Sequence, residues 1–110
     1  MKQGDIYWAV LDSTKGNEQN GKRPVLIISG NAMNENLDIV IACPLSTSLK
    51  GYPGSVLLKK TKENGLAADS EVITFQIRTL SKHRLTEKLG SIKPAQLKEV
   101  IQALNEVLVY

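Results

Sequence analysis

Two polar stretches of the chain carry residue types that can bind a phosphate group. The first, GKRP, places Arg23 directly before an apolar run that begins at Pro24. The second, PLST, ends in Thr47, which lies between Ser46 and Ser48 just after another apolar run. A guanidinium offers a fixed fork of donors to phosphate oxygens, and a hydroxyl adds one donor or acceptor. Together these side chains would form a small oxyanion-binding site, although an arginine at a strand end can also pair with a carboxylate such as Glu18 or with a carbonyl.

Other catalytic patterns are mostly absent from the sequence. His83 is the only histidine and Cys43 the only cysteine, which excludes a two-histidine acid–base pair and an internal disulfide. No spacing of His, Cys, Asp and Glu resembles a zinc or calcium site, and neither a GxSxG nor a P-loop motif occurs. We therefore expect no metal and no cofactor, and chemistry that rests on loop residues.

The two polar stretches meet only if the apolar runs beside them pair as neighbouring strands. Residues 24–29 (PVLIIS) and 38–45 (DIVIACPL) are rich in strand-forming residues, and the turn sequence GNAMNEN separates them. In an antiparallel pair the start of one strand lies beside the end of the other. This pairing would bring Arg23 and Thr47 together at one end of a sheet.

Further strands and one helix complete the predicted fold. Alternating residues in 5–11 predict a strand, with Trp8 in the core. Strands are also expected at residues 55–60, 70–77 and 86–92. Pro94 suits the first turn of a C-terminal helix, in which apolar residues recur at helical spacing. The prediction is one domain, residues 1–110, of mainly β structure in a small antiparallel sheet or barrel with a C-terminal α-helix.

Charge and hydropathy limit the setting and the partners. Fourteen Lys and Arg against eleven Asp and Glu give a net charge of +3, which permits an anionic partner. No apolar run approaches the roughly 20 residues of a membrane span, and the N-terminus lacks the apolar region of a signal peptide. We expect a cytoplasmic protein without membrane association.

The sequence closely resembles the MazF/PemK family of toxin endoribonucleases. The matching segments are GDIYWAVLDSTKGNEQNGKRPVLIIS, PLSTSLKGYPGSV and QIRTLSKHRLTEKLGSI, and with the helix they cover nearly the whole chain in order. The resemblance implies an SH3-like small barrel of the plasmid-maintenance toxin (CcdB/PemK) type that forms a homodimer. It implies metal-independent, sequence-specific cleavage of single-stranded RNA by attack of the 2′-hydroxyl, which leaves 2′,3′-cyclic phosphate and 5′-hydroxyl ends. It also implies a cognate antitoxin, for which we expect an acidic disordered segment because the site faces an anion.

The resemblance also assigns roles to individual residues. The catalytic arginine and threonine of the family fall on Arg23 and Thr47, and its loop glutamate and glutamine fall on Glu18 and Gln19. The loop that carries Glu18 and Gln19 contributes to RNA binding in the family. Glu18 is in addition a catalytic candidate from its chemistry, because a carboxylate can accept a proton.

The identity of the general base stays open. Glu18 is one candidate and Arg23 the other, although a normal arginine stays protonated. Phe75 replaces an acidic residue that other family members carry before the glutamine of QIRT, and Asn17 replaces a histidine found in some members. The sequence therefore favours the version of the mechanism that uses Arg23 and Thr47.

Other residues are candidates for contacts to the RNA. Cations can neutralise backbone phosphates, and Tyr52 and Phe75 can stack on bases unless they pack in the core. The predicted RNA-binding residues are Gln19, Ser46, Ser48, Lys50, Tyr52, Gln76, Arg78, Lys82 and Arg84. Two rival functions are a gyrase-targeting toxin and a non-catalytic RNA-binding module of the same fold, since a fold does not fix a function. The intact GKRP and PLST stretches count against both.

Overall fold

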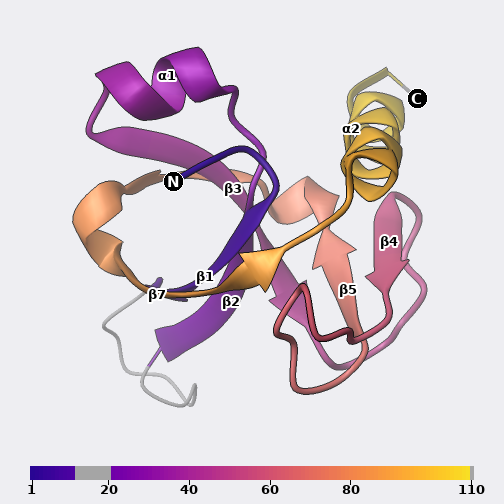
Figure 1. Cartoon of the computed structure of the whole chain (residues 1–110). Helices are drawn as coiled ribbons and strands as arrows, with labels where there is room; N and C mark the ends of the chain where they lie inside the picture. The colour runs from indigo at the N-terminus through magenta and orange to yellow at the C-terminus, as the bar shows by residue number, and fades with distance from the viewer. Residues whose placement is uncertain (12–20, 110) are drawn as a thin grey trace.

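The computed structural model describes residues 1–11 and 21–109. These residues are mainly β structure with a C-terminal helix, as predicted (Figure 1). The strands are β1 (Asp5–Val10), β2 (Lys22–Ile27), β3 (Ile39–Ser46), β4 (Ser55–Leu58), β5 (Ser70–Ile73), β6 (Arg78–Ser81) and β7 (Leu85–Ser91). The helical elements are α1 (Asn31–Asn36), α2 (Pro94–Val109) and the short 3₁₀ helices η2 (Thr74–Gln76) and η3 (Lys82–Arg84). No helix in this part of the chain is long and apolar enough to cross a membrane.

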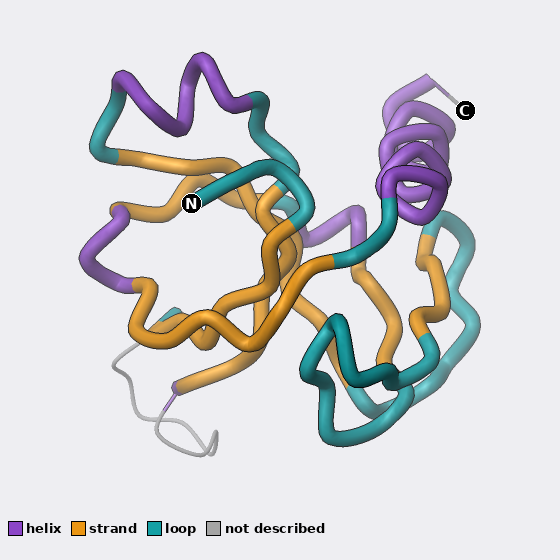
Figure 2. The backbone as a smooth tube through the Cα atoms, in the orientation of Figure 1, coloured by secondary structure: helices purple, strands orange, loops and turns teal. Residues whose placement is uncertain are grey.

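The strands form one antiparallel, strongly curved sheet. Neighbouring strands follow the order β4-β5-β3-β2-β1-β7, and β6 pairs with a separate part of β3. Figure 2 shows β1, β2, β3 and β7 bending around a small barrel, with β4, β5 and α2 beside it. No hydrogen-bonded ladder joins β6 to β7 within the described residues, so the barrel is open.

Both faces of the central strands are buried, against two separate clusters of apolar side chains. Leu26 of β2 packs in one cluster with Cys43 and with Val100 of α2. Val25 and Ile27 point the other way, into a second cluster. Burial on both faces explains why residues 24–27 of β2 are continuously apolar instead of alternating.

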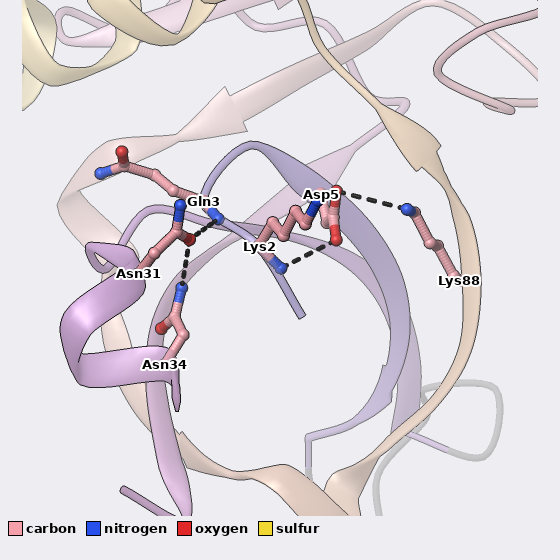
Figure 3. A network of polar contacts seen from close by, with 6 residues as sticks. All are labelled: Lys2, Gln3, Asp5, Asn31, Asn34 and Lys88. Carbon is pink, nitrogen blue, oxygen red and sulfur yellow. Dashed lines mark hydrogen bonds and ion pairs between the residues drawn. The ribbon is translucent and has the colours of Figure 1, made fainter. Parts of the chain in front are cut away.

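The segment 30–36 was expected to be a turn, but residues 31–36 form the helix α1. Asn34 is buried and donates from Nδ2 to the carbonyl oxygen of Ser29 at 2.9 Å, while its Oδ1 accepts from the Ser29 hydroxyl at 2.5 Å. In Figure 3, Asn34 and Asn31 of α1 lie beside Gln3, whose main-chain N–H donates to Asn31 at 2.8 Å. The bonds of Asn34 to Ser29 just before the helix, and the tertiary bond of Asn31 to Gln3, stabilise a helix that its own sequence does not favour.

The strand expected at residues 70–77 is shorter than predicted. It ends at Ile73, and the chain then turns through η2 before β6 begins at Arg78. The hydroxyl of Thr74, which is fully buried, donates to the carbonyl oxygen of Gly54 at 2.5 Å and fixes this turn. The placement of Trp8 in the core was also wrong, because its side chain is only half-buried and lines a cavity.

The loop between β4 and β5 lies tightly against β7. Asn64 is buried, and its Oδ1 accepts from the main-chain N–H groups of Thr61 and Leu66 at 3.0 Å each. Gly65 has a φ of +68°, and a Cβ atom there would lie 2.0 Å from the carbonyl oxygen of Leu89. Only glycine satisfies both constraints.

We predict that Gly65→Ala lowers the free energy of unfolding by about 2 kcal/mol or more, from left-handed backbone strain and the clash with β7. Gly30→Ala is the matched control, because a Cβ at Gly30 meets nothing within 4 Å. Urea denaturation of both variants measures the difference. Equal stability of the two would contradict the described approach of this loop to β7.

Candidate nucleic-acid and active site

The pairing of β2 with β3 brings the two polar stretches together, as the sequence predicted. The ladder is antiparallel, with Val25 opposite Pro44 and Ile27 opposite Ala42. On its other side β2 pairs with β1, where Arg23 lies opposite Ala9. Arg23 therefore lies within the sheet, where its backbone pairs with β1. Its side chain is half-exposed and lies near the end of β3.

Arg23 and Thr47 line the same cavity, which has a volume of about 640 Å³. Lys22, Ser46 and Ser70 add polar groups to its wall. The remaining wall is largely apolar and is formed mostly by Trp8, Pro24, Leu45, Leu66, Ala68 and Leu89. The cavity thus combines a cationic and hydroxyl-bearing edge with apolar walls, an arrangement suited to a ligand that has both a charged and a flat apolar part.

A second, smaller cavity of about 130 Å³ adjoins the first, and Arg23 and Ser46 line both. Ile73 contributes an apolar side chain to its wall. The other lining residues were all predicted to bind RNA: Ser48, Lys50, Tyr52 and Gln76. The structure therefore gathers five of the predicted RNA-binding residues around Arg23, namely these four and Ser46.

Among the described residues, the charged side chains that line the two cavities are all cationic. Lys22, Arg23 and Lys50 line them, and no Asp or Glu is among the described lining residues. In the same part of the chain, no three His, Cys, Asp or Glu side chains are grouped so that they could hold a metal ion. The site is therefore built to attract an anion through cationic side chains and hydroxyls.

The aromatic residues Tyr52 and Phe75 lie on the surface beside the smaller cavity. Their side chains are 43% and 44% exposed, which excludes the alternative that they pack in the core. The rings meet edge to face, with centroids 5.4 Å apart and planes at 84°. The pair offers exposed ring surface on which a base can stack.

Two side chains that often perform catalysis lie outside the cavities. Cys43 is fully buried, and burial raises the pKa of its thiol to about 12, so the thiolate nucleophile does not form near neutral pH. His83 lies in η3, where its Nδ1 is 2.9 Å from the hydroxyl oxygen of Ser81. Neither residue lines the cavities that contain Arg23.

Three of the predicted RNA-binding cations do not line the cavities. Arg84 donates to the carbonyl oxygens of Val10 and Leu11 at 3.0 and 3.2 Å, and Arg78 reaches the carbonyl oxygen of Leu11 at 3.4 Å. Lys82 donates to the carbonyl oxygen of Asn34 in α1. These contacts give all three a structural role, and their contact with RNA stays a prediction.

Glu18, Gln19 and Asn17 lie outside the described residues, so their predicted roles also stay predictions. The structure adds three residues to the site. Trp8 and Lys22 line the larger cavity, and Glu71 accepts hydrogen bonds from the main chain of Lys50 and Gly51. Lys22 belongs to the GKRP stretch and could have been found from its neighbour Arg23. No local pattern marks Glu71, because its hydrogen-bond partners lie about 20 positions away along the chain.

Comparisons with known proteins by sequence and by fold point to the same family. A family model described as "PemK-like, MazF-like toxin of type II toxin-antitoxin system" matches residues 2–108. Endoribonuclease MazF of Staphylococcus saprophyticus is 37% identical over 107 residues, which cover 96% of this chain and 88% of that protein. MazF from Deinococcus radiodurans superimposes with a TM-score of 0.80 at 30% identity, over 100% of this chain and 97% of the other. A mycobacterial endoribonuclease solved in complex with its cognate antitoxin gives a TM-score of 0.79 at 29% identity, over 98% and 94% of the two chains.

Proposed function

The chain belongs to the family of PemK-like, MazF-like toxins of type II toxin–antitoxin systems, and we propose that it is an endoribonuclease that cleaves single-stranded RNA at a specific sequence. The observation that carries the proposal is the shared cavity of Arg23 and Thr47. The resemblance to the family assigns catalytic roles to both residues, and in support of this both line one cavity at the end of the paired strands β2 and β3.

The proposed reaction needs three events at one phosphodiester. The 2′-hydroxyl loses a proton and attacks phosphorus, a phosphorane forms, and the 5′-oxygen leaves with a proton. Arg23 donates to one non-bridging oxygen as negative charge develops, an interaction of a kind typically worth about 3 kcal/mol. Thr47 donates to the other oxygen. The products are a 2′,3′-cyclic phosphate and a 5′-hydroxyl, and the nucleophile comes from the substrate without a metal ion.

The proton transfers need a group besides the hydroxyls that line the cavities. The described lining residues include no carboxylate or histidine, and a normal arginine stays protonated. Glu18, only five positions before Arg23, is the carboxylate nearest to it along the chain. We assign the general base to Glu18 or Arg23.

The RNA strand would run along both cavities, with the scissile phosphate at Arg23. Ser48, Lys50 and Gln76 offer polar contacts on one side, and Tyr52 with Phe75 offers a surface for stacking. On the other side, the apolar wall with Trp8 has room for a base. Such a path would combine phosphate neutralisation with sequence-selective contacts to bases.

Two protein partners follow from the charge and the exposed apolar surface. An acidic, disordered segment of a cognate antitoxin would fold onto the cationic cavities and exclude RNA. A second copy of the chain would cover the exposed apolar residues of α2, which include Ile101 at 39%, Leu108 at 72% and Val109 at 62% exposure. The proposed state is thus a homodimer held by an antitoxin.

Primer extension on a long RNA, run beside a DNA supercoiling assay, separates this function from its rivals. Endoribonuclease activity gives discrete stops at one short sequence and leaves gyrase unaffected. Inhibited supercoiling without RNA stops would identify a gyrase-targeting toxin. Stable RNA binding without stops would identify a non-catalytic module.

We predict that Arg23→Ala reduces RNA cleavage about a hundredfold or more, because the phosphorane loses its main donor. The unfolding midpoint should change little, since the side chain is half-exposed at a strand end. Lys2→Ala is the matched control, as it removes an exposed cation outside both cavities. Single-turnover cleavage rates measure the effect. A well-folded Arg23→Ala variant that cleaves RNA at the wild-type rate would contradict the assignment of the active site to Arg23.

A substrate with a single deoxyribose tests the source of the nucleophile. Replacing only the ribose on the 5′ side of the scissile phosphate should stop cleavage, while binding is nearly unchanged and the strand becomes a competitive inhibitor. Cleavage of the all-ribose strand should persist in excess EDTA. Cutting of the substituted strand at the same position, or loss of activity in EDTA, contradicts the proposed chemistry.

Sedimentation velocity should show a dimer at micromolar concentration. Ile101→Glu on the apolar surface of α2 should shift the protein toward monomer, because a charge would then be buried between the two copies. Lys98→Glu, at an exposed position on the same helix, is the matched control. A wild-type monomer at this concentration would count against the homodimer.

A further inference from the structure

Glu71 is a buried carboxylate directly beneath the segment that joins β3 to β4. Its side chain is only 5% exposed. It lies on β5, opposite Ser46 of β3 and opposite Leu57 of β4. It therefore lies beside the end of β3 and beside β4, the two strands that the segment 47–54 connects. This segment carries Thr47, Lys50 and Tyr52.

The carboxylate is satisfied mainly by the main chain of that segment. Its Oε1 accepts from the N–H of Lys50 at 3.0 Å, and its Oε2 accepts from the N–H of Gly51 at 2.7 Å. The hydroxyl of Ser55 is 3.3 Å from Oε2 and 2.8 Å from the carbonyl oxygen of Tyr52. No ion pair of Glu71 with a cation occurs among the described residues. Hydrogen bonds from the loop are therefore what compensates the buried charge.

The geometry of these bonds requires both carboxylate oxygens. Each oxygen faces one main-chain donor, so an amide in place of the carboxylate would turn its NH₂ group toward one N–H. A buried donor left without a partner is unfavourable, and the loop would move to find another. Gly51 has a φ of +65°, so the backbone at this point adopts a conformation that few other residues would accept.

We infer that Glu71 is a positioning residue that holds Lys50, Gly51 and Tyr52 in the conformation that binds RNA. The inference rests on the proposed function. Glu71 does not line either cavity and acts through Lys50 and Tyr52, which line the smaller one. A preorganised loop avoids the entropy loss of ordering on binding, so the carboxylate contributes to substrate affinity and hardly to the chemical step.

The test is the steady-state kinetics of Glu71→Gln on a short cleavable RNA. We expect KM to rise about tenfold while kcat changes less than about twofold, the pattern of an interaction made equally in ground state and transition state. Asp5→Asn is the matched control, because Asp5 is also 5% exposed and accepts a main-chain N–H, from Lys2 at 2.9 Å. Figure 3 shows Asp5 in that contact and paired with Lys88 of β7. Asp5→Asn should leave KM unchanged even if it lowers stability.

A double-mutant cycle separates positioning from general destabilisation. If Glu71 acts through the loop, Glu71→Gln should raise KM much less in a Lys50→Ala background than in the wild type. Equal increases in both backgrounds, or a KM no higher than that of Asp5→Asn, would overturn the inference. A fall in kcat with unchanged KM would overturn it too, because it would place Glu71 in the chemical step.

Amide hydrogen exchange of the wild-type protein tests the anchor without any substitution. Lys50 and Gly51 should exchange as slowly as the amides of the neighbouring strands, because the buried carboxylate accepts both. Exchange as fast as that of unprotected loop amides would overturn the inference, even if Glu71→Gln does not fold. If the wild type cleaves no RNA, the proposed function fails, while this measurement still decides whether the anchor exists.

Discussion

The antiparallel pairing of β2 with β3 holds Arg23 beside the segment that begins at Thr47. A shift of the register by one residue would turn every side chain of β2 to the opposite face of the sheet. The register is fixed because Leu26 packs in one buried cluster while Val25 and Ile27 pack in the other. The hydrophobic core thus sets the position of a cation at the surface, and catalysis of the proposed kind needs such a preorganised donor.

Buried polar side chains hold the loops around the cavities in the same way. Glu71 accepts main-chain N–H groups of the segment 47–54, and Asn64 accepts those of the β4–β5 loop, whose residues Leu66 and Ala68 line the larger cavity. Each anchor replaces hydrogen bonds to water with bonds inside the protein, so the loop has one preferred conformation. The cavity walls are therefore shaped before any ligand binds.

The sequence was sufficient to predict the strands that form the site and the C-terminal helix, because continuous apolar runs and helical periodicity are local signals. The same runs predicted that Arg23 and Thr47 meet. It was not sufficient for α1, which depends on the buried hydrogen bonds of Asn34, or for the end of β5, which depends on Thr74 and Gly54. Trp8 was misplaced because alternation shows which residues share a face and not whether a cavity opens there. Glu71 was missed because its partners are distant in the chain.

The central claim is that Arg23 stabilises a phosphorane formed by attack of the 2′-hydroxyl of the substrate. The chemical identity of the new RNA ends tests it most directly. Mass spectrometry of a short RNA cleaved by the wild-type protein should show one fragment ending in a 2′,3′-cyclic phosphate and the other beginning with a 5′-hydroxyl. Fragments that carry a 5′-phosphate and a 3′-hydroxyl would show that water is the nucleophile and would contradict the account.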